Sequence, residues 1–268
     1  MSVITISRGS YRRGKEIAEK AALTLGYECI GREILLEASQ QFNIPEIKLE
    51  KAINDAPSVL DRFTHGKEKY IAFIRATLLK QLQKDNVVYH GLAGHFFVQT
   101  VPHVLKVRIT ADIEDRVREE MKITEFSATT TRYLLKKDDE ERRKWGLRLY
   151  GKDTWDPDLY DMVLHVQNMT TDEAVQIVVT AAMMPSFHTT PESQAIIDDL
   201  SLAAQVEAAL VNEFTVARVT ARGGSVYVAV RAPAAKEVEI TSRVADTVQR
   251  VDHVKTVSVK VVGADFVA

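Results

Sequence analysis

Cysteine is almost absent from this chain of 268 residues, which has only Cys29. An internal disulfide is therefore excluded, and we expect a reducing, cytoplasmic location. No apolar run approaches the roughly 18 residues that span a bilayer. The opening residues, MSVITIS, lack the basic and long apolar segments of a signal peptide. The histidines show no metal-ligand spacing, so we expect no structural zinc site.

Net charge is also small, at −2, so no overall field favours binding to nucleic acid or to an anionic membrane. We therefore expect neither a nucleic-acid partner nor a transmembrane segment. Apolar residues make up 46% of the chain, enough to bury a core. The length suits one large domain or two smaller ones.

Strand-like and helix-like patterns alternate through the first 184 residues. Strands are predicted over residues 3–7, 86–90, 103–110 and 160–166, and helices over residues 14–25, 67–83, 124–145 and 170–184, with another helix starting at residue 112. Strands separated by helices predict a parallel sheet with helices on both faces.

A polar, proline-bearing segment at residues 185–193 interrupts this pattern, and we interpret it as a linker. Beyond it the order is helix, strand, strand, helix, strand, with Gly223-Gly224 as a hairpin turn. The sequence therefore predicts an α/β domain at residues 1–184 and a small α+β domain, αββαβ, at residues 194–268.

The main chemical signal lies at the first strand–helix junction. Residues Gly9 to Lys15 read G-x-x-x-x-G-K after a strand and before a helix, the context of a phosphate-binding loop, or P-loop. There, backbone N–H groups and a helix N-terminus bind phosphate, and the lysine adds positive charge. Glu16 stands where serine or threonine normally ligates magnesium, and its carboxylate can either hold Mg²⁺ or repel phosphate. An ordinary basic turn is the alternative, since it produces such spacing by chance.

The segment ISRGSYRRGKEIAEKAALTLGY, residues 6–27, resembles the opening of the cytidylate kinase-like family, and later segments of the first domain follow that family in order. The resemblance implies a P-loop kinase with a helical lid, which uses ATP and Mg²⁺ to phosphorylate a nucleoside monophosphate such as CMP. Glu16 is usual in that family. Lys15 replaces its arginine, and Tyr11 and Arg13 replace two of its glycines.

The resemblance also implies roles for individual residues. ATP contacts are expected at the loop, from Arg8, Gly9, Ser10, Tyr11, Arg12, Arg13, Gly14, Lys15 and Glu16, with Glu16 as metal ligand. The lid set is Lys137, Asp139 and Arg142. In it, Lys137 contacts substrate, Asp139 orients the transferred phosphate and Arg142 neutralises it. Arg32 is expected on the acceptor phosphate. The alternative for all four is a solvated helix surface.

One position weakens the kinase prediction. Leu92 stands where the family has an arginine that reads the acceptor, and leucine donates no hydrogen bond. His95 is a candidate replacement, but packing is the commoner role of such a histidine. Together with Tyr11 and Arg13, Leu92 favours a rival function, a nucleotide-binding regulatory protein with little or no turnover.

Residues 194–268 resemble a BON domain, a small binding module, through a helix with Val206 and Leu210 and the hairpin at Gly224. No catalytic cluster is visible there. The resemblance implies contact with phospholipid, a ligand or another protein, and a structural or self-association role is the alternative.

Overall fold

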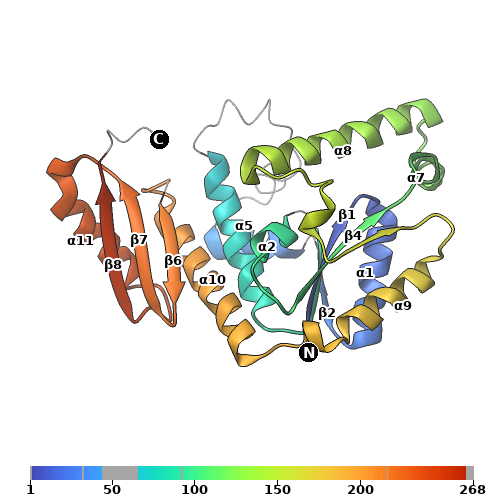
Figure 1. Cartoon of the computed structure of the whole chain (residues 1–268). Coiled ribbons are helices and arrows are strands. Elements are labelled where there is room, and N and C mark those ends of the chain that lie inside the picture. The colour runs from blue at the N-terminus through green and yellow to red at the C-terminus, as the bar shows by residue number, and fades with distance from the viewer. Residues whose placement is uncertain (1, 32, 44–65, 92, 216, 264–268) are drawn as a thin grey trace. The chain divides into compact units, whose positions relative to one another are not determined.

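The structure is a computed structural model and describes residues 2–31, 33–43, 66–91, 93–215 and 217–263 (Figure 1). These residues form two compact units. Unit 1 holds the described residues of Met1–Glu33 and Lys84–Thr190. Unit 2 holds those of Ile34–Ala52, Phe63–Gln83 and Pro191–Ala268.

Unit 1 is built on a five-stranded parallel sheet in the order β2-β3-β1-β4-β5. The strands are β1 (Val3–Arg8), β2 (Glu28–Ile30), β3 (Val87–His90), β4 (Val104–Thr110) and β5 (Met162–His165). The predicted parallel sheet is confirmed, and β2 is an addition, too short to show a sequence period. Because parallel strands end at one edge, the segments that follow β1, β3 and β4 gather there.

Helices flank this sheet (Figure 1). They are α1 (Tyr11–Leu25), α6 (Gly94–Phe97), α7 (Ile113–Glu120), α8 (Ala128–Tyr150) and α9 (Thr171–Ala182). Helices α1 and α9 share one core with the sheet, in which Ile4, Ile17 and Val178 are fully buried. Helix α9 begins with a capping box between Thr170 and Glu173.

Unit 2 contains α2 (Glu33–Phe42), α5 (Gly66–Leu82), α10 (Pro191–Leu210) and α11 (Glu237–Val248). Its strands are β6 (Arg218–Arg222), β7 (Ser225–Arg231) and β8 (Thr256–Val262). Strands β6 and β7 form the predicted hairpin, and β8 pairs parallel to β7. Val206, Val228 and Val244 lie at the centre of the core. The αββαβ order is confirmed.

The start of α10 differs from the expectation. The helix begins at Pro191, inside the segment interpreted as a linker, because proline is well suited to the first position of a helix. Helix α10 packs against α5, which lies before that segment in the chain. An ion pair of 2.8 Å joins Arg75 to Glu207, and Gln83 donates to Asp198 at 2.8 Å. The division into residues 1–184 and 194–268 stays a prediction.

Candidate phosphate site

The junction between β1 and α1 is tighter than the motif spacing predicts. Helix α1 begins at Tyr11, so only Gly9 and Ser10 separate it from the strand. Both of their N–H groups donate to the carbonyl of Ile109, at 2.8 and 3.1 Å. The Gly14 N–H donates to the carbonyl of Ser10 at 3.0 Å, as part of the helix. The backbone donors that remain for an anion are therefore those of the first helical turn, where Ser10 makes no side-chain cap.

The side chains of Lys15 and Glu16 are exposed and engaged in ion pairs along α1. Lys15 Nζ lies 3.6 Å from Glu19, and Glu16 lies 2.9 Å from Lys20. Lys20 also contacts Asp172 at 2.8 Å, and hydrogen bonds to Asp172 and then Glu16 raise its pKa to about 12. Exposed pairs of this kind contribute little stability, so Lys15 can leave Glu19 for a phosphate at small cost.

The fit to Mg²⁺ rests on Glu16 alone. In the part of the chain that the structure describes, no group of three or more His, Cys, Asp or Glu side chains can hold a metal ion. Mg²⁺ in kinases is usually bound through one or two carboxylates together with substrate phosphates and water. A single carboxylate fits that pattern, provided that the ion displaces the ammonium group of Lys20.

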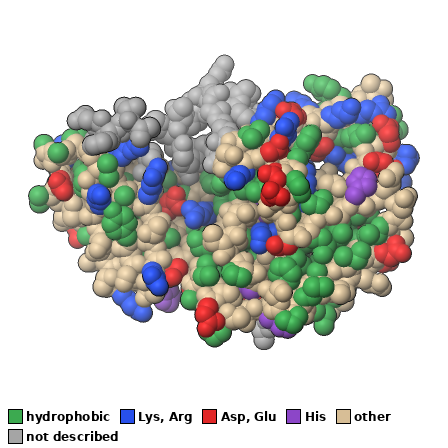
Figure 2. All heavy atoms as spheres, viewed as in Figure 1, with side chains coloured by type: hydrophobic (Ala, Val, Ile, Leu, Met, Phe, Trp, Pro, Cys, Tyr) green, Lys and Arg blue, Asp and Glu red, His purple; other side chains and the backbone are tan. Residues whose placement is uncertain are grey.

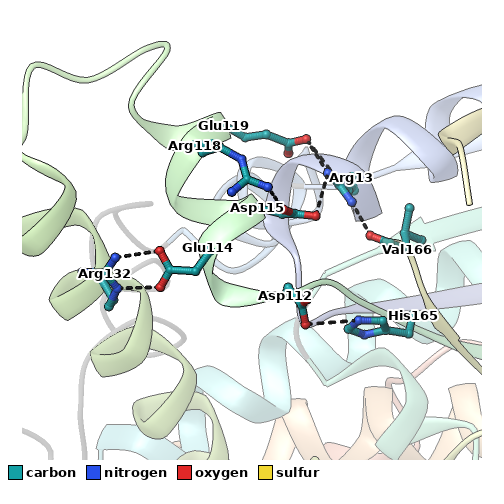
Figure 3. A network of polar contacts seen from close by, with 9 residues as sticks. All are labelled: Arg13, Asp112, Glu114, Asp115, Arg118, Glu119, Arg132, His165 and Val166. Atoms are coloured by element: carbon teal, nitrogen blue, oxygen red, sulfur yellow. Dashed lines mark hydrogen bonds and ion pairs between the residues drawn. The ribbon is translucent and has the colours of Figure 1, made fainter. Parts of the chain in front are cut away.

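Arg13 turns toward α7 (Figure 3), and so does Arg12. Arg13 contacts Glu119 at 2.9 Å and Asp115 at 3.8 Å, and it donates to the carbonyl of Val166. Arg12 donates to the carbonyl of Glu119 at 3.2 Å. The charge of Arg13 is thus balanced within the protein, and the phosphate contacts expected for this pair stay a prediction. Instead, Arg13 joins α1 to α7 and to the end of β5.

The lid helix α8 brings one expected cation to the loop. Arg142 is partly buried, and its Nη1 donates to the carbonyl of Arg8, the last residue of β1, at 3.2 Å. Burial lowers the pKa of Arg142, against the opposing charge of Asp139. Nη1 and Nη2 of Arg116 donate to the carboxylate of Asp139, at 2.6 and 2.9 Å. Lys137 is exposed. Among the described residues, no carboxylate forms an ion pair with Arg142.

Arg108 is a further cation at this edge that the sequence reasoning missed. It lies on β4, and a side-chain Cβ built on Gly9 would lie 3.5 Å from its Nη2. Its guanidinium is 5.7 Å from the ring centroid of Tyr160, and Nη1 donates to the Tyr160 hydroxyl at 3.4 Å. No carboxylate within the described ranges forms an ion pair with it. The available signal was an arginine in an otherwise apolar half of a strand, VRIT.

His95 is a packing residue in this structure. It is buried with its ring centroid 4.1 Å from that of Phe96, and Nε2 lies 3.3 Å from the Tyr160 hydroxyl. Burial, followed by the charge of Arg108, lowers its pKa to about 3. A neutral, enclosed imidazole is no substitute for the arginine missing at Leu92. Leu92 and Arg32 both lie outside the described residues.

A second histidine, His90, lies beside Gly31, which precedes the expected acceptor contact Arg32 in the chain. His90 ends β3, and a side chain at Gly31 would come within 2.5 Å of its ring. Burial and the charge of Arg8 lower the pKa of His90 to about 4. The carboxylate of Glu33 accepts the Gly31 N–H at 2.7 Å. Glycine at position 31 thus leaves room for a neutral imidazole.

The sequence profile of the cytidylate kinase-like family matches residues 3–168, more than half of the chain. The search of curated proteins found no match to this chain. Among solved structures, an uncharacterized protein from Eubacterium ventriosum ATCC 27560 has a TM-score of 0.52 and 14% identity, covering 68% of this chain and 98% of its own. Shikimate kinase from Bacteroides thetaiotaomicron has a TM-score of 0.43 and 10% identity, with coverages of 68% and 99%. Dephospho-CoA kinase from Campylobacter jejuni has a TM-score of 0.34 and 18% identity, with coverages of 67% and 95%.

Proposed function

Because this chain belongs to the cytidylate kinase-like family, we propose that it is an ATP-dependent phosphotransferase acting on a nucleoside monophosphate, such as CMP, or a related small acceptor. The observation that carries the proposal is the contact of Arg142 with the Arg8 carbonyl at 3.2 Å. This hydrogen bond places the guanidinium of Arg142, a lid residue, beside the strand that leads into the loop. Among the described residues, Arg142 has no carboxylate partner. Such a cation favours an anionic ligand.

Phosphoryl transfer depends mainly on positioning and on neutralising the charge of the phosphates. The ATP phosphates bind at the first turn of α1, where Lys15 swings from Glu19 to reach them. Arg142 neutralises the transferred group from the lid side. Arg108 on β4 replaces the family arginine that is absent at position 92. Its guanidinium is positioned by donating to the Tyr160 hydroxyl. Asp139 acts indirectly, by holding Arg116.

Mg²⁺ would be carried in with ATP and would polarise the phosphates when bound. Glu16 is the candidate protein ligand. Its pairing with Lys20 at 2.9 Å orients the carboxylate before the ion arrives. Glu16→Gln should therefore weaken the dependence of ATP binding on Mg²⁺, which calorimetry with and without the ion measures.

A nucleotide-binding regulatory protein with little or no turnover is the second candidate function. It is favoured by the occupied N–H groups of Gly9 and Ser10, because both donate to Ile109 instead of lining an open phosphate loop. In that case the αββαβ part, which resembles a BON domain, is the module that binds a protein, a ligand or phospholipid.

A coupled assay of ADP formation separates the two functions. The full chain is given ATP and Mg²⁺ with CMP, UMP, AMP, GMP or dCMP in turn, and ATP affinity is measured by calorimetry. Turnover with at least one acceptor supports the kinase. ATP binding without turnover on any of them supports the regulatory protein, and absence of ATP binding contradicts both.

The contribution of Arg108 is tested in the same assay. Arg108→Gln should raise the KM for the acceptor about tenfold or more, because a charged hydrogen bond typically contributes roughly 1.5–3 kcal/mol. Arg132→Gln is the matched control, since Arg132 on α8 pairs with Glu114 on α7 (Figure 3). Equal effects of the two substitutions would remove Arg108 from the site.

A further inference from the structure

The exposed face of the β6–β7–β8 sheet carries charge of only one sign. Along each strand, side chains alternate between the core and solvent, and Val219, Val226 and Val257 belong to the core. The exposed positions include four cations, Arg218, Arg222, Arg231 and Lys260. No Asp or Glu occurs in any of the three strands. The local charge of this face therefore differs in sign and density from the net charge of −2 for the whole chain.

The strand register places an aromatic ring between these cations. Tyr227 lies at the middle of the central strand and is 42% exposed. Tyr227 forms a row across the sheet with Thr220 on β6 and Ser258 on β8, which lie opposite it on the neighbouring strands. The row on one side contains Arg218 and Lys260, and the row on the other side contains Arg222 and two hydroxyl residues, Ser225 and Thr256. Rows two residues apart on a strand are separated by about 7 Å.

These charges are not balanced within the protein. Among the described residues, none of the four cations on the face forms an ion pair with a carboxylate. Arg243 on α11, in contrast, contacts both Glu213 and Glu239. Lys and Arg side chains are visible over the area of the strands in Figure 2. A flat face with several unbalanced cations is complementary to a polyanion.

We propose that this face binds single-stranded nucleic acid, with a base stacked on Tyr227 and the neighbouring phosphates on the surrounding Arg and Lys side chains. Sheet faces that bind single strands combine an exposed aromatic ring with cations in this way. A membrane-binding face would need apolar side chains to insert among the lipids. Around Tyr227 the face offers hydroxyl groups, from Thr220, Ser225, Thr256 and Ser258, and the short side chain of Ala229. This proposal does not depend on turnover at the nucleotide site.

The test uses the full chain and fluorescein-labelled 12-mers of uridylate RNA and thymidylate DNA, with fluorescence anisotropy measured over a range of salt concentrations. Tyr227→Ala should weaken binding about tenfold or more, and Tyr227→Phe should retain it, because stacking needs the ring and not the hydroxyl. The double variant Arg218→Ala/Lys260→Ala should reduce the slope of log affinity against log salt by about 1.4, or about 0.7 for each phosphate that is no longer neutralised.

The matched control is Lys236→Ala/Arg250→Ala, which removes two exposed cations outside the sheet face and should leave affinity and slope unchanged. Binding of both 12-mers supports recognition of the shared backbone and bases, and binding of RNA alone supports recognition that includes the 2′-hydroxyl. The proposal is overturned if neither 12-mer binds at low salt. It is also overturned if the control and the sheet variants weaken binding equally, or if vesicles of phosphatidylglycerol bind while the 12-mers do not.

Discussion

His95 makes the stability of the protein sensitive to acid. Its pKa is lowered from the ordinary 6.5 to about 3, first by burial and then by Arg108. The folded protein therefore holds the neutral form, while the unfolded chain binds a proton at ordinary pKa. The stabilisation is fully present above pH 6.5 and is lost as the pH falls toward 3. Between pH 7 and pH 4.5 the loss amounts to roughly 2–3 kcal/mol.

His95→Phe keeps a ring against Phe96 and removes the titration. Urea unfolding at pH 7 and pH 4.5 gives the change in the free energy of unfolding between them. This change should be roughly 2–3 kcal/mol smaller in the variant than in the wild type, whatever the substitution costs at pH 7. His90, whose pKa of about 4 acts in the same direction, is present in both proteins.

His188→Gln is the control, because His188 is exposed, and it should lose as much stability on acidification as the wild type does. If His95→Phe also loses as much as the wild type, His95 is not held neutral in the interior. The buried position of His95 between Phe96 and Tyr160 would then not hold.

Three further perturbations address the loop and the second unit. Lys15→Ala should weaken ATP binding by roughly 1.5–3 kcal/mol in calorimetry, whereas Lys144→Ala on α8 should not, and equal affinities in all three proteins would remove Lys15 from the phosphate site. Arg75→Ala should lower the free energy of unfolding by about 1–3 kcal/mol, because it leaves Glu207, whose pKa is raised by burial, without the cation at 2.8 Å; Glu207→Gln should cost less. A fragment of residues 1–184 lacks α10 and should unfold at a lower urea concentration than the full chain. A fragment that kept full stability and ATP binding would instead establish the domain boundary at residues 185–193.

The sheet of unit 1 was predictable because its buried strands are short apolar runs between helical patterns. The Gly223-Gly224 hairpin was predictable for a local reason, since both glycines have positive φ, 57° and 92°. The start of α1 was not. The motif spacing placed it at Gly14, but contacts of Arg13 with Glu119 and Val166, more than 100 residues away, accompany a helix that begins earlier.

The site could be predicted only in part. The lid pattern identified Arg142, whose contact with the Arg8 carbonyl spans 134 residues. The lid pattern did not show that Asp139 binds Arg116, because the sequence alone does not tell whether Asp139 pairs with Arg116 or with Arg142. Arg108 was missed because strand alternation tells which face a side chain occupies but not which loop lies beside it. Total charge likewise concealed the basic sheet face, since charge summed over the chain carries no information about position.

The proposed action of Arg142 on the transferred phosphate can be measured through kcat for CMP phosphorylation. Arg142→Ala is compared with Arg143→Ala, since Arg143 pairs with Asp153 at 2.8 Å and is not at the loop. Arg142→Ala should lower kcat by on the order of 100-fold or more, while the Kd for ATP should change by less than about threefold. Arg143→Ala should leave both values close to those of the wild type. If the wild type is active and Arg142→Ala leaves its kcat unchanged, Arg142 does not act on the transferred phosphate.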